Sequence, residues 1–245
     1  MSDRTPRLRM FAGPNGSGKS TVKDLSRLPS RHFGVYVNPD ELEATLRRDG
    51  RLPLGPFRVT AGDDEARVWF ATAMSSRDKA GLGGATEGSC RGDVLDFGGV
   101  AVNSYHASML ADFLRQKLIA GRVSFSFETV MSHPDKVQLL QVARAAGFRT
   151  YLYYVATEDP AINVARVRLR VKQGGHDVPE GKIVCRYARS LGLLREAIRH
   201  TDRAYFFDNS ETEPWFFAEI TAGRTMELQS AVMPVWFKSA VYDKF

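Results

Sequence analysis

The chain has 245 residues, 43% of them hydrophobic and 25% charged, a composition typical of a soluble globular protein. Its formal net charge of +6 and its pI near 9.4 indicate an anionic partner, a condition that nucleotides, sugar phosphates and nucleic acids all meet. The N-terminus lacks the apolar region of a secretory signal, and no stretch reaches the roughly 18 apolar residues of a membrane span. Cys90 and Cys185 show no metal or redox spacing. We therefore expect a cytoplasmic protein.

A glycine-rich segment near the N-terminus matches the phosphate-binding pattern G-x-x-x-x-G-K-[ST]. It lies between a predicted strand, Leu8–Ala12, and a predicted helix that begins at Thr21. Its glycines allow successive backbone N–H groups to face one anion, Lys19 adds a charge for the outer phosphates, and Ser20 offers a hydroxyl to Mg²⁺. We therefore expect ATP and Mg²⁺ as cofactors. The predicted nucleotide-binding residues of the loop are Gly13, Asn15, Gly16, Ser17, Gly18, Lys19, Ser20 and Thr21.

Strands and helices are predicted to alternate along the rest of the chain, which indicates a mainly parallel sheet of five strands with helices on both faces. This is the α/β architecture of P-loop NTPases and kinases. The further predicted strands are 33–37, 123–127, 151–155 and 204–207. The predicted helices after the first are 40–46, 104–120, 134–146, 160–173 and 180–200, with Asp159 as an N-cap and Pro160 in a first turn.

We expect one P-loop kinase domain over residues 1–245, with three further segments. Residues 51–103, rich in Gly, Asp and Arg, are predicted to form a partly looped insertion. Residues 159–186 are predicted to form a helical lid. Residues 212–245 are predicted to form a hairpin followed by an aromatic tail.

Acidic residues follow several of the predicted strands. Ligands of such sheets lie at the carboxyl ends of the strands, so the phosphate-binding loop, Asp40, Glu128 and Asp208 are expected along one rim. Phosphoryl transfer to an alcohol needs a carboxylate that accepts the hydroxyl proton, and Asp40 is the candidate. A structural alternative is that Asp40 and Glu43 form a helix capping box.

Glu128 and Thr129 end the run Ser124–Thr129. A carboxylate at this position is suited to binding sugar hydroxyls. It is also suited to holding Mg²⁺ and polarising water, as in motor ATPases, or to capping the next helix. Thr129 is the weaker candidate of the two.

Three arginines lie on one predicted helix, and two of them are candidates for a phosphate clamp. Arg166 and Arg170 are four residues apart and share a face, whereas Arg168 points elsewhere. Guanidinium groups bind phosphate oxygens and neutralise charge that develops during transfer. Arg186 on the next helix is a third candidate, and a solvated basic face is the alternative. His176 and Asp177 fit a turn of the lid better than a catalytic dyad.

Several segments in this order resemble the zeta toxin family of P-loop kinases. The more specific ones are Asn38–Glu41, an Asn-Pro-Asp-Glu stretch, and 174–179, a Gly-Gly-His-Asp-Val-Pro stretch. The other matching stretches are 13–21, 124–130, 154–155, 163–171, 186–191 and 208–210.

The resemblance implies a kinase that uses ATP and Mg²⁺ to phosphorylate a hydroxyl of a sugar nucleotide, typically UDP-N-acetylglucosamine. It implies nucleotide and magnesium contacts for Lys19 and Ser20, and it makes Asp40 the catalytic base. Glu128 and Thr129 match the sugar-nucleotide site. The phosphate-clamping arginines of the family correspond to Arg166, Arg170 and Arg186, and some members have an antitoxin protein as partner.

Two features depart from the family's plasmid-borne toxins. Those toxins carry an arginine-bearing stretch after the base, whereas here Asp40 precedes Glu41-Leu42-Glu43, and the insertion at 51–103 is additional. The chain is therefore more similar to the free-standing Asn-Pro-Asp-Glu branch. Two alternatives stay open: a kinase for another small acceptor (a dinucleotide, nucleoside or antibiotic), and a nucleic-acid-associated P-loop ATPase. We favour a small anionic substrate over nucleic acid.

Overall fold

The computed structural model describes residues 5–25, 29–78, 89–98, 101–175 and 177–245. The chain divides into two compact units. Unit 1 comprises residues 1–33 and 126–245, and unit 2 comprises residues 34–125. The predicted lid and the predicted tail both fall in unit 1, and the predicted insertion falls in unit 2.

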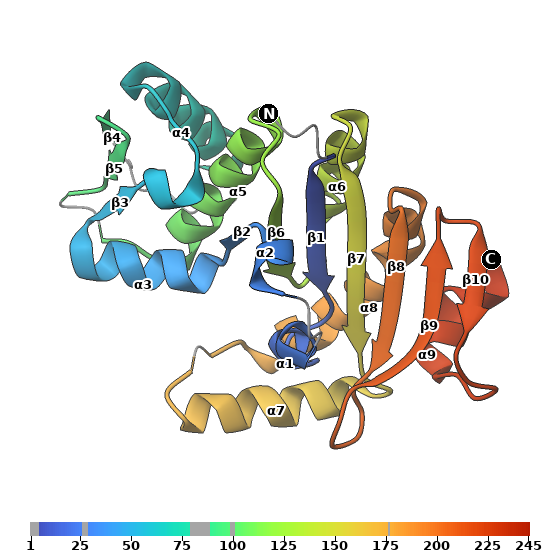
Figure 1. The fold of residues 1–245 in the computed structure, drawn as a ribbon. Coiled ribbons are helices and arrows are strands. Elements are labelled where there is room, and N and C mark those ends of the chain that lie inside the picture. The colour runs from blue at the N-terminus through green and yellow to red at the C-terminus, as the bar shows by residue number, and fades with distance from the viewer. Residues whose placement is uncertain (1–4, 26–28, 79–88, 99–100, 176) are drawn as a thin grey trace. The chain divides into compact units, whose positions relative to one another are not determined.

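The strands of unit 1 form one sheet in the order β10-β9-β8-β7-β1-β6 (Figure 1). β1 is parallel to β7 and β7 is parallel to β8, whereas the β9–β10 hairpin joins β8 in antiparallel fashion. The expected mainly parallel α/β sheet is confirmed, but the expected count of five strands is wrong, since six belong to unit 1. The bounds are β1 Arg7–Ala12, β6 Phe125–Thr129, β7 Arg149–Ala156, β8 Arg203–Asp208, β9 Trp215–Thr221 and β10 Thr225–Leu228.

Aromatic side chains pack across the central strands of this sheet. The rings of Phe11 and Tyr153 stack with centroids 4.7 Å apart, and Tyr153 stacks on Tyr205 at 5.0 Å. Such aromatic and β-branched neighbours stabilise a pleated surface. They fix β1, β7 and β8 beside one another, so that the loops after these strands have a rigid base.

Two helices of unit 1, α8 and α9, pack against strands β7 and β8. Phe237 of α9 packs on Phe206 with centroids 4.9 Å apart, and Ser190 of α8 is hydrogen-bonded to Tyr154 at 2.9 Å. The predicted cap is confirmed at α7, where the Asp159 side chain accepts from Ala161 N at 2.7 Å. The bounds are α1 Lys19–Leu25, α2 Ser30–Phe33, α6 Asp135–Ala145, α7 Pro160–Lys172, α8 Glu180–Arg199, α9 Val235–Ala240 and η2 Tyr242–Lys244.

Unit 2 has a three-stranded antiparallel sheet, β3-β5-β4, and a small aromatic core. In that core the Phe70 ring meets Phe97 and Phe113 with centroids 5.5 and 5.7 Å apart. The predicted insertion is therefore more regular than a partly looped segment, although its glycine run at 81–84 lies outside the described residues. The bounds are β2 Val35–Val37, α3 Pro39–Asp49, β3 Arg51–Pro53, η1 Gly55–Phe57, α4 Asp63–Asp78, β4 Ser89–Arg91, β5 Val94–Asp96 and α5 Ser104–Ala120.

Within the described ranges, every helix is too short or too polar to cross a bilayer. In the same ranges, no group of three or more His, Cys, Asp or Glu residues is placed to hold a metal ion.

Candidate active site

The loop between β1 and α1 has a backbone that only glycine can follow at three points. Gly13, Gly16 and Gly18 have φ angles of +148°, +73° and +91°, values that side chains with a Cβ rarely adopt. A Cβ on Gly13 would lie 1.9 Å from the Val155 carbonyl oxygen of β7. The loop is therefore pressed against the end of the neighbouring strand.

Two asparagines from other elements hold this loop in place through hydrogen bonds to its carbonyls. Asn163 of α7 donates from Nδ2 to the Asn15 carbonyl at 2.7 Å. Asn209, directly after β8, donates from Nδ2 to the Ser17 carbonyl at 2.8 Å. Both asparagines are buried, and buried carbonyls that accept side-chain donors hold their segments rigidly. Sequence reasoning gave neither residue a role, although a buried amide after a strand is a usable signal.

Lys19 folds back over the loop. Its Nζ donates to the carbonyls of Gly13 at 3.0 Å and Pro14 at 2.9 Å. These carbonyls hold the ammonium group at the loop until phosphate oxygens, which attract it more strongly, replace them.

Glu128 lies at the end of β6 beside the start of α1. Its Oε2 accepts from the Ser20 hydroxyl at 2.8 Å, and its Oε1 lies 3.4 Å from Lys23 Nζ. Oxygen donors of a carboxylate and a hydroxyl are the ligands that Mg²⁺ prefers, so this pair fits the expected ion. The alternative in which Glu128 caps the next helix is wrong, because α6 begins only at Asp135.

Thr129 takes part in the turn after β6. Its hydroxyl accepts from Met131 N at 3.1 Å, and its carbonyl accepts from Gly13 N at 3.3 Å. Thr129 thus anchors the first residue of the phosphate-binding loop through its backbone.

Asp208 is buried rather than displayed on the rim. Its Oδ2 accepts from Trp236 Nε1 at 2.8 Å and its Oδ1 accepts from Ser210 N at 2.9 Å. The carboxylate therefore ties the C-terminal helix α9 to the turn that carries Asn209.

The candidate clamp arginines have different surroundings. Arg166 donates to the carbonyls of Asn209 at 2.6 Å and Glu211 at 3.0 Å, so part of its guanidinium positions the turn after β8. Arg170 is exposed on α7, and Arg186 is half-buried on α8.

The other polar residues of the predicted lid lie apart from the loop contacts. Arg168 is exposed and forms an ion pair with Glu180. Asp177 is exposed. His176 lies outside the residues that the structure describes.

Asp40 belongs to unit 2, in the first turn of α3. Asn38 is the N-cap of this helix and accepts from Asp40 N at 3.0 Å, while Glu43 forms an ion pair with Arg47 at 2.6 Å. The alternative of a capping box formed by Asp40 and Glu43 is therefore wrong. Within the described ranges the exposed Asp40 carboxylate has no hydrogen-bond or ion-pair partner, as a base awaiting a substrate requires.

Solved structures with a similar fold include complexes of two protein systems. A chain of the AvrRxo1-ORF1:AvrRxo1-ORF2 complex with sulphate ions has a TM-score of 0.53 at 14% identity, covering 94% of this chain and 62% of that one. The complex with ATP gives 0.52 at 15% identity, with 93% and 61% covered. A chain of the PezAT chromosomal toxin-antitoxin system of Streptococcus pneumoniae gives 0.53 at 12% identity, with 100% and 82% covered. This chain thus spans about three fifths of the AvrRxo1 chain, and these likenesses establish the fold.

Sequence comparison adds a relative and a family. An uncharacterized protein of Haemophilus influenzae is 29% identical over 183 residues, which cover 72% of this chain and 89% of the relative. The family model described as Zeta toxin matches residues 99–210. The chain is therefore similar to the zeta toxin family over residues 99–210. The zeta toxin match includes Glu128, Asn163 and Asn209, three residues that contact the loop or the helix after it.

Proposed function

We propose that this protein is a zeta toxin-like kinase that transfers the γ-phosphate of ATP to a hydroxyl of a sugar nucleotide such as UDP-N-acetylglucosamine. The observation that carries the proposal is the pairing of Ser20 with Glu128 beside the glycine loop. It combines a phosphate cradle with two oxygen donors for Mg²⁺. The family resemblance of the Asn38–Glu41 stretch supports the choice of acceptor.

The phosphate-binding half of the site has a simple division of roles. Bound ATP and Mg²⁺ supply the phosphoryl group and neutralise its charge. The amides in the second half of the loop, from Gly18 to Thr21, and the ammonium of Lys19 bind phosphate oxygens. Ser20 and Glu128 would hold the ion, and Lys23 keeps the Glu128 carboxylate oriented.

The acceptor half of the proposal assigns the base. Asp40 accepts the proton of the acceptor hydroxyl, a role that its exposed carboxylate allows. Glu128 and Thr129 are the proposed sugar-nucleotide residues.

The arginines of the lid are proposed to exclude water and bind phosphate oxygens. A guanidinium carries five N–H donors, and Arg166 uses part of this set on carbonyls. Arg170 and Arg186 complete the proposed clamp. Exclusion of water limits hydrolysis of ATP before the acceptor binds.

Asp40→Asn tests the base. The variant is expected to lose phosphoryl transfer by about 100-fold or more, since general-base catalysis contributes roughly 10²–10⁴-fold, while ATP binding is retained. Transfer is measured with labelled ATP and UDP-N-acetylglucosamine, and ATP affinity by calorimetry. Glu43→Gln is the matched control, because it neutralises another carboxylate of α3. Undiminished transfer by Asp40→Asn removes Asp40 from this role.

The acceptor is tested by a screen with labelled ATP. UDP-N-acetylglucosamine, a dinucleotide, a nucleoside and an aminoglycoside are offered in parallel, and label in the first is expected. Label in another acceptor would support the kinase assignment and replace the proposed substrate. ATP turnover that DNA or RNA stimulates, lost in Glu128→Gln and retained in Asp40→Asn, would instead establish a nucleic-acid-associated ATPase.

An antitoxin protein is a further proposed partner. The structural relatives include a two-protein complex and a toxin-antitoxin system, which supports a search for a protein that co-purifies with this chain and blocks its ATP-dependent transfer.

A further inference from the structure

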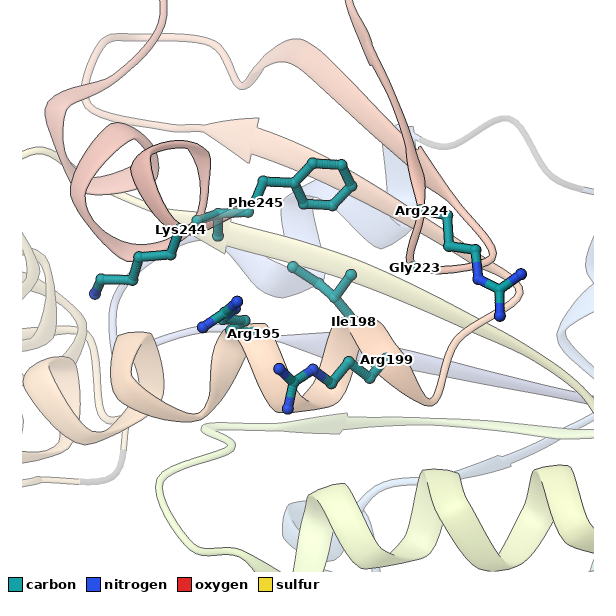
Figure 2. Close-up of a pocket in the computed structure, with 8 residues that line it drawn as sticks. Arg195, Ile198, Arg199, Gly223, Arg224, Lys244 and Phe245 are labelled. Atoms are coloured by element: carbon teal, nitrogen blue, oxygen red, sulfur yellow. The ribbon is translucent and has the colours of Figure 1, made fainter.

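A cavity of about 360 Å³ lies in unit 1 between the end of α8, the β9–β10 turn and the C-terminal segment (Figure 2). Its volume falls in the range of small-molecule sites, roughly 300–1,000 Å³. The proposed phosphoryl transfer uses no residue of this cavity.

The lining is strongly basic. It includes Arg195 and Arg199 of α8, Arg224 of the β9–β10 hairpin and Lys244 of η2, and it has no acidic side chain. Glu196 offsets Arg199 through a hydrogen bond of 2.8 Å, and the Arg199 guanidinium holds the pKa of this carboxyl below its ordinary value. Over the part of the chain that the structure describes, the side chains of the other three cations have no hydrogen-bond or ion-pair partner.

The helix dipole explains only part of this charge. Cations in the last turn of a helix are stabilised by the exposed carbonyls there, which accounts for Arg199. Arg224 and Lys244 come from different elements. Gathering four cations around one hollow costs electrostatic free energy that an anion relieves.

The floor of the cavity is apolar. Ile198 and Val241 are 2% and 1% exposed, while Phe245 is 51% exposed. In Figure 2, Ile198 points from α8 toward Phe245, between the cations of α8 and Lys244. An exposed aromatic ring beside buried aliphatic groups provides a surface for a flat or apolar part of a ligand.

The frame around the cavity is closely packed. Gly223 has a φ of +65°, and a Cβ there would lie 3.2 Å from the Ile198 carbonyl oxygen, so the hairpin turn rests directly on α8. Ala222 N donates to the Asp202 carbonyl at 2.8 Å, and Arg144 donates to the Arg199 carbonyl at 2.8 Å. The cations thus project from a fixed scaffold.

We propose that this cavity is a second, non-catalytic site for a small phosphorylated molecule of the nucleotide class. Arg195 and Lys244 bind the phosphate oxygens, Arg199 lies at the edge of the charged set, and Arg224 lies at the opposite end of the cavity (Figure 2). Phe245 and Ile198 receive the base or sugar.

The test measures binding of labelled AMP by equilibrium dialysis in a Lys19→Ala background, which weakens the phosphate-binding loop. We expect one AMP per chain, and we expect Arg195→Ala/Arg224→Ala in this background to weaken binding by about tenfold or more, as the loss of charged hydrogen bonds does. The matched control is Arg48→Ala/Arg67→Ala, which removes two exposed arginines of unit 2 and is expected to change nothing.

Two further measurements keep the test decisive. Lys244→Glu, at an exposed residue, is expected to weaken AMP binding even if the double variant proves unstable. Inorganic phosphate is expected to displace AMP, and adenosine is expected to bind at least tenfold more weakly. Unchanged affinity in both pocket variants, tight adenosine binding, or no AMP binding by Lys19→Ala would each overturn the proposal. Phosphoryl transfer is assayed separately, so failure here leaves the kinase assignment intact.

Discussion

Gly18 is tightly constrained within the phosphate-binding loop. Its φ of +91° is unfavourable for any residue with a Cβ, and a Cβ there would lie 2.1 Å from Nδ2 of Asn209. That amide holds the Ser17 carbonyl. A side chain at position 18 therefore strains the backbone and displaces one support of the loop.

Gly18→Ala is expected to lower the free energy of unfolding by about 2–4 kcal/mol, from backbone strain and a lost buried hydrogen bond, and to abolish ATP binding. Denaturant unfolding and calorimetry measure the two effects. Gly192→Ala of α8 is the control, because a Cβ there meets nothing within 4 Å. That variant is expected to gain about 0.5–1 kcal/mol of stability. Normal ATP affinity in Gly18→Ala would contradict this account.

At the residue scale, sequence reasoning succeeds where a motif fixes both residue type and spacing. Lys19 and Ser20 could be assigned because each position of the loop has one chemical task. Asn163 and Asn209 could not, since their role depends on strands and helices that meet only in the folded chain. The capping-box alternative placed Asp40 rather than Asn38 at the cap of α3, because both residue types favour that position.

A hydrogen-bonded chain links α8 to the phosphate-binding loop. Tyr187 donates to the Thr157 carbonyl at 2.6 Å, the Thr157 hydroxyl donates to Asn163, and Asn163 holds Asn15. Burial raises the pKa of the Tyr187 phenol to about 12. The neutral phenol is thus an integral part of the support for the loop.

Alkaline pH tests this link. Because the folded-state pKa of Tyr187 lies above the unfolded value of 10.0, its contribution is complete below pH 10 and is lost as pH rises toward 12. Tyr187→Phe is expected to be less stable by about 1 kcal/mol at pH 7 and to lose less stability than wild type between pH 10 and 12. Denaturant unfolding measures both, and Tyr242→Phe, at a 44% exposed position, is expected to behave as wild type. Parallel profiles for Tyr187→Phe and wild type would refute the link.

At the scale of elements, periodicity located the long helices well, and the predicted 104–120 coincides with α5. Strand ends were less accurate: β6 runs from Phe125 to Thr129 instead of 123–127, since a polar Glu-Thr pair looks like a loop when its partners are unknown. The addition of β9 and β10 to the main sheet depends on pairing with β8. Pairing between strands is invisible to the local pattern of either strand.

The whole molecule is expected to be stabilised by its nucleotide, because ATP binds the folded loop and not the unfolded chain. At 100 times the dissociation constant, ATP with Mg²⁺ adds about 2.7 kcal/mol, which corresponds to a rise of roughly 5–10 °C in Tm for a chain of this size. Lys19→Ala is expected to lose most of this rise. Scanning calorimetry measures it, with Lys238→Ala, an exposed residue of α9, as the control. An equal rise in Lys19→Ala would show that ATP acts elsewhere.

The bond between Trp236 and Asp208 joins the last helix of unit 1 to the residue preceding Asn209, which in turn holds Ser17. Two hydrogen bonds and one peptide link therefore connect the Trp236 indole, near the end of the sequence, to the phosphate-binding loop near its beginning. Rearrangement of this loop changes the polarity around that ring, so the protein carries an intrinsic fluorescent sensor of nucleotide occupancy.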